Sequence, residues 1–126
     1  MTSGGRWVVA IVDDDQAVRD STRFLLESQD FAVQTYQSGA DFLKEEPDSA
    51  CLIIDYHMPG LDAFELVFEL RKRGSHVPII LITASTDPVV KRRAAQVGIK
   101  RVLEKPVSSE VLLGATRESF DNDSSP

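Results

Sequence analysis

The chain has 126 residues, enough for one domain with a buried core and too few for two. Its net charge of −6 argues against broad attraction to nucleic acid or anionic membranes. No apolar run reaches the roughly 18 to 20 residues that span a bilayer, and the single cysteine, Cys51, excludes an internal disulfide. These features predict a cytoplasmic protein that binds neither membranes nor nucleic acid directly.

Short apolar runs alternate along the chain with segments of helical periodicity. The apolar runs predict strands over residues 7–12, 31–36, 51–54, 79–82 and 101–104. Helices are expected after Asp15, Ser38, Asp62, Asp87 and Ser108, which are residue types that cap helix N-termini. The alternation requires βαβ crossovers, so the expected fold is α/β, a doubly wound five-stranded parallel sheet with helices on both faces. We expect this domain over residues 7–120, between a flexible N-terminus (1–6) and a flexible C-terminal tail (121–126).

The stretch from Cys51 to Gly60 runs straight from four apolar residues into one carboxylate, Asp55, and then into a Pro-Gly turn. Such a run is typical of a strand buried on both faces of a parallel sheet. Asp55 would then lie at the carboxyl end of the strand, where open α/β sheets bind their ligands. On its own, Asp55 is better explained as the first residue of a turn.

Other strands end in the same way, at Asp13 and Asp14, at Thr83 and at Lys105. Clustered carboxylates repel one another unless a cation offsets their charge, and Mg²⁺ or Mn²⁺ does this with oxygen ligands. Asp13 and Asp14 are adjacent and cannot both point directly at one ion from an extended strand. One of them is therefore expected to bind the ion directly and the other through water.

An ammonium and a hydroxyl beside a metal-bound carboxylate suit a phosphoryl group, and a carboxylate can attack phosphorus to form an aspartyl-phosphate. Each residue also has a structural explanation. The acidic run can favour a helix N-terminus, Thr83 can bond to the backbone, and Lys105 can be a solvated surface charge. Their joint position at four strand ends is what favours a functional site.

The pattern of these residues resembles the receiver domain of two-component response regulators, over nearly the whole chain from about residue 7 to 119. Within this family, the run Val12-Asp13-Asp14-Asp15-x-x-Val18-Arg19-Asp20-Ser21 and the segment Glu104-Lys105-Pro106 resemble FixJ-type receivers. The resemblance rests on Asp13-Asp14, Asp55-x-x-Met58-Pro59-Gly60, Thr83-Ala84 and Lys105-Pro106. It implies a flavodoxin-like fold with strand order 2-1-3-4-5.

The resemblance also implies a role for each site residue. Asp55 would accept a phosphoryl group from a histidine kinase or a phosphotransfer protein, and Thr83 and Lys105 would hold the phosphoryl oxygens. Asp14 and Asp55 would bind Mg²⁺ directly. Asp13 would act through water.

Two further expectations follow from the same resemblance. The backbone carbonyl of His57 would be a further ligand to the metal. The Lys105–Pro106 peptide bond would be cis, a form that only proline makes accessible at low cost.

The chain departs from the family pattern three residues before Lys105, where Val102 replaces an aromatic residue whose ring usually moves on phosphorylation. Positions that tune phosphate lifetime in the family are His57 and Ser85. We expect the His57 ring to face solvent beside the site and to influence dephosphorylation without binding the metal. The basic cluster 91–93 is expected to be a solvated helix face. The alternatives are a nucleic-acid patch and a contact with an acidic partner or a second receiver.

These observations predict a phosphorylation-controlled switch that catalyses only its own phosphotransfer and dephosphorylation. The charge added by phosphorylation would bias a surface near the fourth helix, fifth strand and fifth helix. The expected partners, besides the kinase, are a second copy of the chain in a phosphorylation-dependent homodimer and a downstream effector or fused output domain. A phosphatase of the haloacid-dehalogenase kind is the main alternative, although Asp13-Asp14-Asp15-Gln16-Ala17 lacks the Thr of its Asp-x-Asp-x-Thr motif. A flavin or nucleotide-binding domain is a third alternative, but no Gly-rich phosphate loop follows the first predicted strand of this chain. A receiver that is not phosphorylated and only binds partners is less compatible with the intact Asp, Thr and Lys set.

Overall fold

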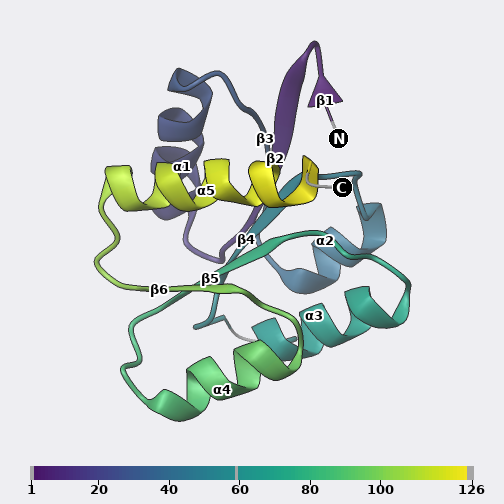
Figure 1. Ribbon diagram of the computed structural model, residues 1–126, viewed down its shortest axis with the longest axis vertical. Coiled ribbons are helices and arrows are strands. Elements are labelled where there is room, and N and C mark those ends of the chain that lie inside the picture. Colours follow the sequence, from purple (N-terminus) through teal and green to yellow (C-terminus); the bar gives the residue numbers. More distant parts are fainter. Residues whose placement is uncertain (1, 59, 125–126) are drawn as a thin grey trace.

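The computed structural model describes residues 2–58 and 60–124, with side chains through Phe120. A parallel sheet forms its centre (Figure 1). Its strands are β2 (Arg6–Val12), β3 (Ala32–Tyr36), β4 (Cys51–Asp55), β5 (Ile79–Thr83) and β6 (Arg101–Glu104). The spatial order is β3-β2-β4-β5-β6, which confirms the order 2-1-3-4-5 expected for the five predicted strands.

Helices cover both faces of the sheet. They are α1 (Gln16–Ser28), α2 (Gly39–Glu45), α3 (Ala63–Lys72), α4 (Pro88–Gln96) and α5 (Ser109–Ser124). Helices α1 and α5 pack on one face, and α2, α3 and α4 pack on the other (Figure 1). None of the helices in the described part of the chain is long and apolar enough to cross a membrane.

The predicted caps set where the helices begin. The carboxylates of Asp15, Asp62 and Asp87 and the hydroxyl of Ser38 each accept a backbone N–H from the first turn of the following helix. These bonds satisfy donors that have no partner within the helix. Pro88 follows the cap of α4, where the missing N–H of proline costs nothing.

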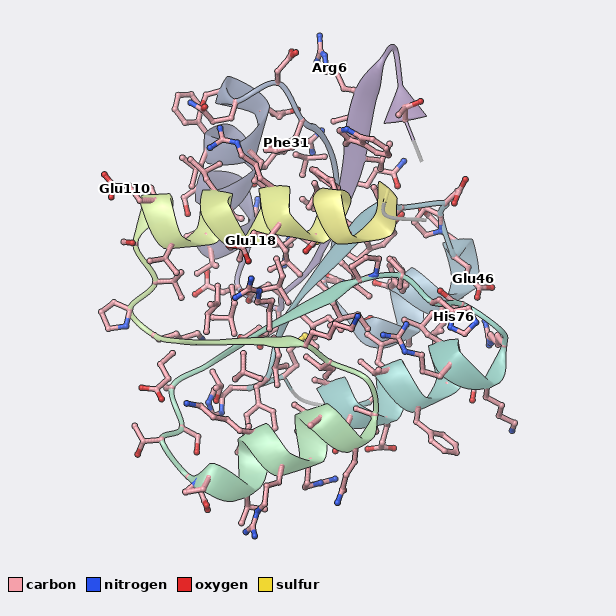
Figure 2. All side chains as sticks on the ribbon, viewed as in Figure 1. Arg6, Phe31, Glu46, His76, Glu110 and Glu118 are labelled. Carbon is pink, nitrogen blue, oxygen red and sulfur yellow. The ribbon has the colours of Figure 1, made fainter. Side chains whose placement is uncertain are left out.

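Strand β4 forms the middle of the core because both of its faces are covered. All five of its residues are buried. Leu52 and Ile54 pack in the layer toward α2, α3 and α4, whereas Cys51 and Ile53 pack toward α1 and α5. Side chains fill the space between the sheet and both helix layers (Figure 2). A strand buried on both faces explains the uninterrupted apolar run seen in the sequence.

The ends of the chain contain more regular structure than the sequence indicates. Strand β1 (Thr2–Ser3) pairs antiparallel with the start of β2, and Gly4 and Gly5 turn the chain between them with positive φ angles of 57° and 81°. Helix α5 continues to Ser124, inside the segment expected as a polar tail. Residues 1, 125 and 126 lie outside the described part of the chain, as does Pro59 of the Met-Pro-Gly turn.

Candidate phosphoryl-transfer site

The predicted site residues lie at the carboxyl ends of four neighbouring strands. Asp13 and Asp14 follow β2, Asp55 ends β4, Thr83 ends β5 and Lys105 follows β6. Backbone hydrogen bonds continue the ladder past the strand ends, since the Lys105 N–H donates to the Thr83 carbonyl at 2.8 Å. The parallel register therefore brings together residues that are up to 92 positions apart in the sequence, from 13 to 105.

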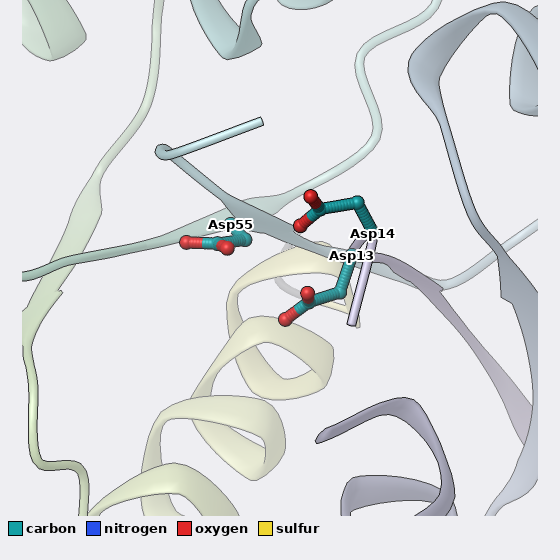
Figure 3. A group of neighbouring side chains, drawn as sticks. All are labelled: Asp13, Asp14 and Asp55. Atoms are coloured by element: carbon teal, nitrogen blue, oxygen red, sulfur yellow. The ribbon is translucent and has the colours of Figure 1, made fainter. Parts of the chain in front are cut away.

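Three carboxylates form the acidic part of the site (Figure 3). Asp13, Asp14 and Asp55 each offer one oxygen, and these oxygens lie within 4.8 Å of one another. Asp13 and Asp55 are each only 6 % exposed, whereas Asp14 is exposed. Burial raises the pKa of Asp13, and the charges of Asp55 and Asp14 raise it further, against the opposing effects of the Asp15 N–H and Lys105. The cluster thus concentrates negative charge that a hard cation would offset.

Lys105 supplies positive charge directly to the central carboxylate. Its Nζ lies 3.0 Å from Oδ1 of Asp55. The same oxygen accepts the backbone N–H of His57 at 3.2 Å. Asp55 is therefore a buried carboxylate with one ammonium and one amide donor already directed at it, while the Lys105 side chain remains 39 % exposed and free to adjust.

Thr83 lies on the strand next to Asp55 and is almost fully buried, with 1 % of its surface exposed. Its Oγ1 accepts the N–H of Ser85 at 2.9 Å. The Nε2 of His57 lies 3.3 Å from this oxygen and accepts the N–H of Ala84 at 3.2 Å. His57 is exposed, as predicted from the sequence, but its ring is engaged with Thr83 and Ala84.

The contact of the His57 ring could not be read from the sequence, because nothing in the residue pattern indicates which way a loop imidazole turns. A second residue was also missed. Arg19 of α1 donates from Nη1 to the carbonyl of Asp13 at 2.7 Å and so fixes the loop that carries the acidic pair. Its position one helical turn after the Asp15 cap is the only sequence feature that could have suggested it.

The structure also places the remaining features that the sequence singled out. The Lys105–Pro106 peptide bond is cis, as predicted. Val102 is half-buried and packs against the layer containing α3 and α4. Within the basic cluster, Lys91 pairs with Glu104 of β6 at 3.6 Å, and the Arg93 guanidinium lies 4.5 Å from the centre of the Phe64 ring.

The fold and the site together define a class, the receiver domains of two-component signalling. The family model described as the response regulator receiver domain matches residues 9–117. The chain belongs to this family, which consists of regulatory domains rather than enzymes that act on an outside substrate.

Relatives identify the group within the family. The chain is 39 % identical over 114 residues to the transcriptional regulatory protein FixJ of Azorhizobium caulinodans, covering 89 % of this chain and 54 % of that protein. It is 34 % identical to the response regulator TodT of Pseudomonas putida, over 90 % of this chain and 51 % of that protein. The similarity to FixJ-type receivers predicted from the sequence is confirmed. The chain spans about half the length of these curated relatives.

Solved structures of receiver proteins have the same fold as this chain. The crystal structure of FixJ-N matches with a TM-score of 0.84 and 32 % identity, covering 96 % of each chain. The chemotaxis protein CheY4 of Vibrio cholerae matches with a TM-score of 0.85 and 27 % identity, covering 91 % of this chain and 99 % of that one. The flavodoxin-like fold is thus shared with CheY-type receivers.

Proposed function

We propose that Asp55 accepts a phosphoryl group from the phosphohistidine of a sensor kinase or phosphotransfer protein, and that the modified chain acts as a signalling switch. The contact of Lys105 Nζ with Asp55 Oδ1 at 3.0 Å, inside a cluster of three carboxylates, is the observation that carries this proposal. A merely structural acid at a strand end would need neither a buried acidic neighbour nor a lysine from another strand.

The reaction forms one bond and breaks one. An oxygen of Asp55 attacks phosphorus, the P–N bond of the donor phosphohistidine breaks, and the leaving imidazole takes up a proton. The Lys105 ammonium and the His57 amide lie at the reacting carboxylate, so they stabilise negative charge where it develops. In this proposal the Thr83 hydroxyl donates to a phosphoryl oxygen, which is supported by its position at the end of the strand next to Asp55.

The acidic cluster fits a hard divalent cation, because it provides carboxylate oxygens within 4.8 Å of one another and because burial, together with the charges of Asp55 and Asp14, raises the pKa of Asp13. We propose Mg²⁺, with Mn²⁺ as a substitute. Asp14 and Asp55 would hold it directly, with Asp13 through water and the His57 carbonyl as a further ligand. When bound, the ion would neutralise charge on the phosphoryl oxygens.

Phosphorylation adds about −1.5 to −2 charges and three acceptor oxygens in a site that already holds three acids. We propose that this change shifts a pre-existing equilibrium in the surface of α4, β6 and α5. The partners would be a kinase in the cytoplasm and either a second copy of the domain, a separate effector or a fused output domain. The matched part is 54 % of FixJ and 51 % of TodT, so each relative has a further segment outside the match, which is consistent with a fused output domain.

The proposal is tested by adding acetyl phosphate and Mg²⁺ and measuring intact mass. We expect one phosphoryl group per chain in the wild type and none in Asp55→Asn. Light scattering on the same samples tests for a dimer. Steady hydrolysis of excess phosphomonoester, without accumulation of phosphoprotein, would instead favour the haloacid-dehalogenase alternative and reject the switch.

A further inference from the structure

The His57 side chain engages the Thr83 hydroxyl, which the proposed function assigns to a phosphoryl oxygen, and the Ala84 N–H beside it. Its Nε2 accepts the Ala84 N–H at 3.2 Å and lies 3.3 Å from the Thr83 hydroxyl oxygen. Because Nε2 accepts from a backbone amide, this nitrogen carries no proton, and the Thr83 hydroxyl is the donor in the second contact. One ring nitrogen thus takes the place of an anionic oxygen at the end of β5.

The backbone of His57 is fixed to the acceptor itself. Its N–H donates to Asp55 Oδ1, and the preceding residue, Tyr56, donates its N–H to the carbonyl of Ile82 at 2.8 Å. The imidazole therefore extends from the loop after β4 across to the loop after β5. Phosphoryl oxygens and the ring cannot both use the Ala84 N–H, since a single amide hydrogen makes one good bond.

The ring also begins a continuous set of contacts that leads away from the site. The Tyr56 ring packs edge-on against His57 with centroids 4.9 Å apart, and against Phe64 of α3 with centroids 5.4 Å apart. The Arg93 guanidinium of α4 lies over the Phe64 ring, 4.5 Å from its centroid. A displacement of His57 would thus reach α4 through two aromatic rings.

We propose that His57 is a positioning residue that holds the Thr83 and Ala84 donors until the phosphoryl group displaces its ring, and that this displacement is passed through Tyr56 and Phe64 to Arg93 on α4. The inference rests on the proposed phosphorylation of Asp55. It gives the chain a moving aromatic group although Val102 stands where the family usually has one. The change then reaches the surface of α4, β6 and α5 from α4, through the contact of Arg93 with Phe64.

The test compares wild type with His57→Ala, using His76→Ala as the matched control. His76 is the other histidine of the chain and is exposed in the loop before β5, at the opposite end of that strand from Thr83 (Figure 2). Removing the competing ring frees both donors. We expect acetyl phosphate to phosphorylate His57→Ala about fivefold faster than wild type, the effect of one released hydrogen bond, and His76→Ala at the wild-type rate.

Nitrogen-15 NMR with Mg²⁺ and BeF₃⁻ supplies the readout that a purely structural role would not change. In the wild type we expect the His57 Nε2, the Ala84 amide and the Arg93 Nε–H signals all to shift on addition of BeF₃⁻. In His57→Ala and in Tyr56→Leu, Ala84 should still shift while the Arg93 shift is reduced by about half or more.

An Arg93 shift of wild-type size in His57→Ala, or phosphorylation no faster than in wild type, would overturn the inference. If instead the wild type gains no phosphoryl group that depends on Asp55, the proposed function itself fails, and the mass measurement distinguishes that result.

Discussion

Lys105 and Asp55 are 50 residues apart in the sequence, and their side chains meet at 3.0 Å at the carboxyl end of the sheet. The lysine follows the edge strand β6, and the aspartate ends the central strand β4, with β5 between them. The lysine therefore reaches across the width of one strand to the carboxylate. This span leaves Thr83, which ends β5, next to the same site.

Replacing Lys105 with alanine should slow phosphorylation of Asp55 by acetyl phosphate about a hundredfold, the typical effect of removing one preorganised charge donor. Fold stability should fall as well, because Asp55 would stay buried next to Asp13 without its ammonium partner, so thermal unfolding is used to confirm that the variant is folded at the assay temperature. Pseudo-first-order rates from intact mass check this, with Lys100→Ala, a substitution at an exposed lysine just before β6, as the control. Equal rates for the two variants would remove Lys105 from the reaction.

Asp13→Asn should stabilise the metal-free protein by about 3 to 5 °C in Tm, or about 1 kcal/mol for a chain of this size. The reason is that the pKa of Asp13 is raised, mainly by burial, so its charge is unfavourable in the folded state. The asparagine can still accept the Asp15 N–H that Asp13 accepts at 2.9 Å. Thermal unfolding in EDTA measures the effect, and a lower Tm for the variant would contradict it.

The raised pKa of Asp13 also determines the direction in which fold stability changes with pH. The pKa of Asp13 is higher in the folded protein than in the unfolded chain, so protonated Asp13 stabilises the fold. This stabilisation is fully present below the unfolded pKa of 3.8 and is lost as the pH rises through the pKa of the folded protein. Bound Mg²⁺ should offset this loss, so the increase in Tm caused by about 10 mM MgCl₂ should grow from about pH 4 to about pH 7. Thermal scans with MgCl₂ or EDTA test it. An increase that does not depend on pH would exclude the acidic cluster as the metal site.

Cys51 should be inert toward thiol reagents in the native protein. It is fully buried, and burial raises the pKa of its thiol from 9.0 to about 12, with a smaller opposing effect from Ser119. Because the thiolate is the reactive form, labelling by Ellman's reagent near pH 8 should be at least about a hundredfold slower than in guanidinium. Comparable rates in the two conditions would mean that β4 is accessible in the native state.

Phe120→Ala should destabilise the fold by about 3 kcal/mol, lowering Tm by roughly 10 °C. Phe120 stacks on Trp7 with centroids 5.2 Å apart and also contacts Phe31, so it fastens α5 to the start of β2. Phe24→Ala is the control, because this residue is 78 % exposed and should change stability by less than about 0.5 kcal/mol. Denaturant unfolding followed by Trp7 fluorescence measures both variants, and similar midpoints would refute the expectation.

Trp7 reports on its packing against Phe120 rather than on the state of Asp55. It lies at the amino end of β2, six residues before Asp13, which corresponds to about 20 Å along an extended strand. Its fluorescence therefore follows folding, and phosphorylation is better followed by mass or by signals from the site.

Local sequence determined the elements and the strand ends, because apolar runs and capping residues are short-range features. The run before Asp55 predicted the central strand, and Asp62 and Asp87 begin their helices where the caps indicated. Parallel topology then required Asp13, Asp55, Thr83 and Lys105 to share one edge of the sheet. That part of the site followed from sequence because the carboxyl ends of parallel strands point the same way.

The tertiary structure alone decided how the side chains around that edge are engaged. The turn of the His57 ring onto Thr83 and Ala84, the contact of Arg19 with the Asp13 carbonyl and the packing of Arg93 on Phe64 all join segments that are distant or out of phase in the sequence. Rotamers of loop and surface residues depend on neighbours brought in by folding and not on local pattern. For this reason the sequence predicted which residues share this edge of the sheet, and only the fold showed that the His57 ring is engaged there with Thr83 and Ala84.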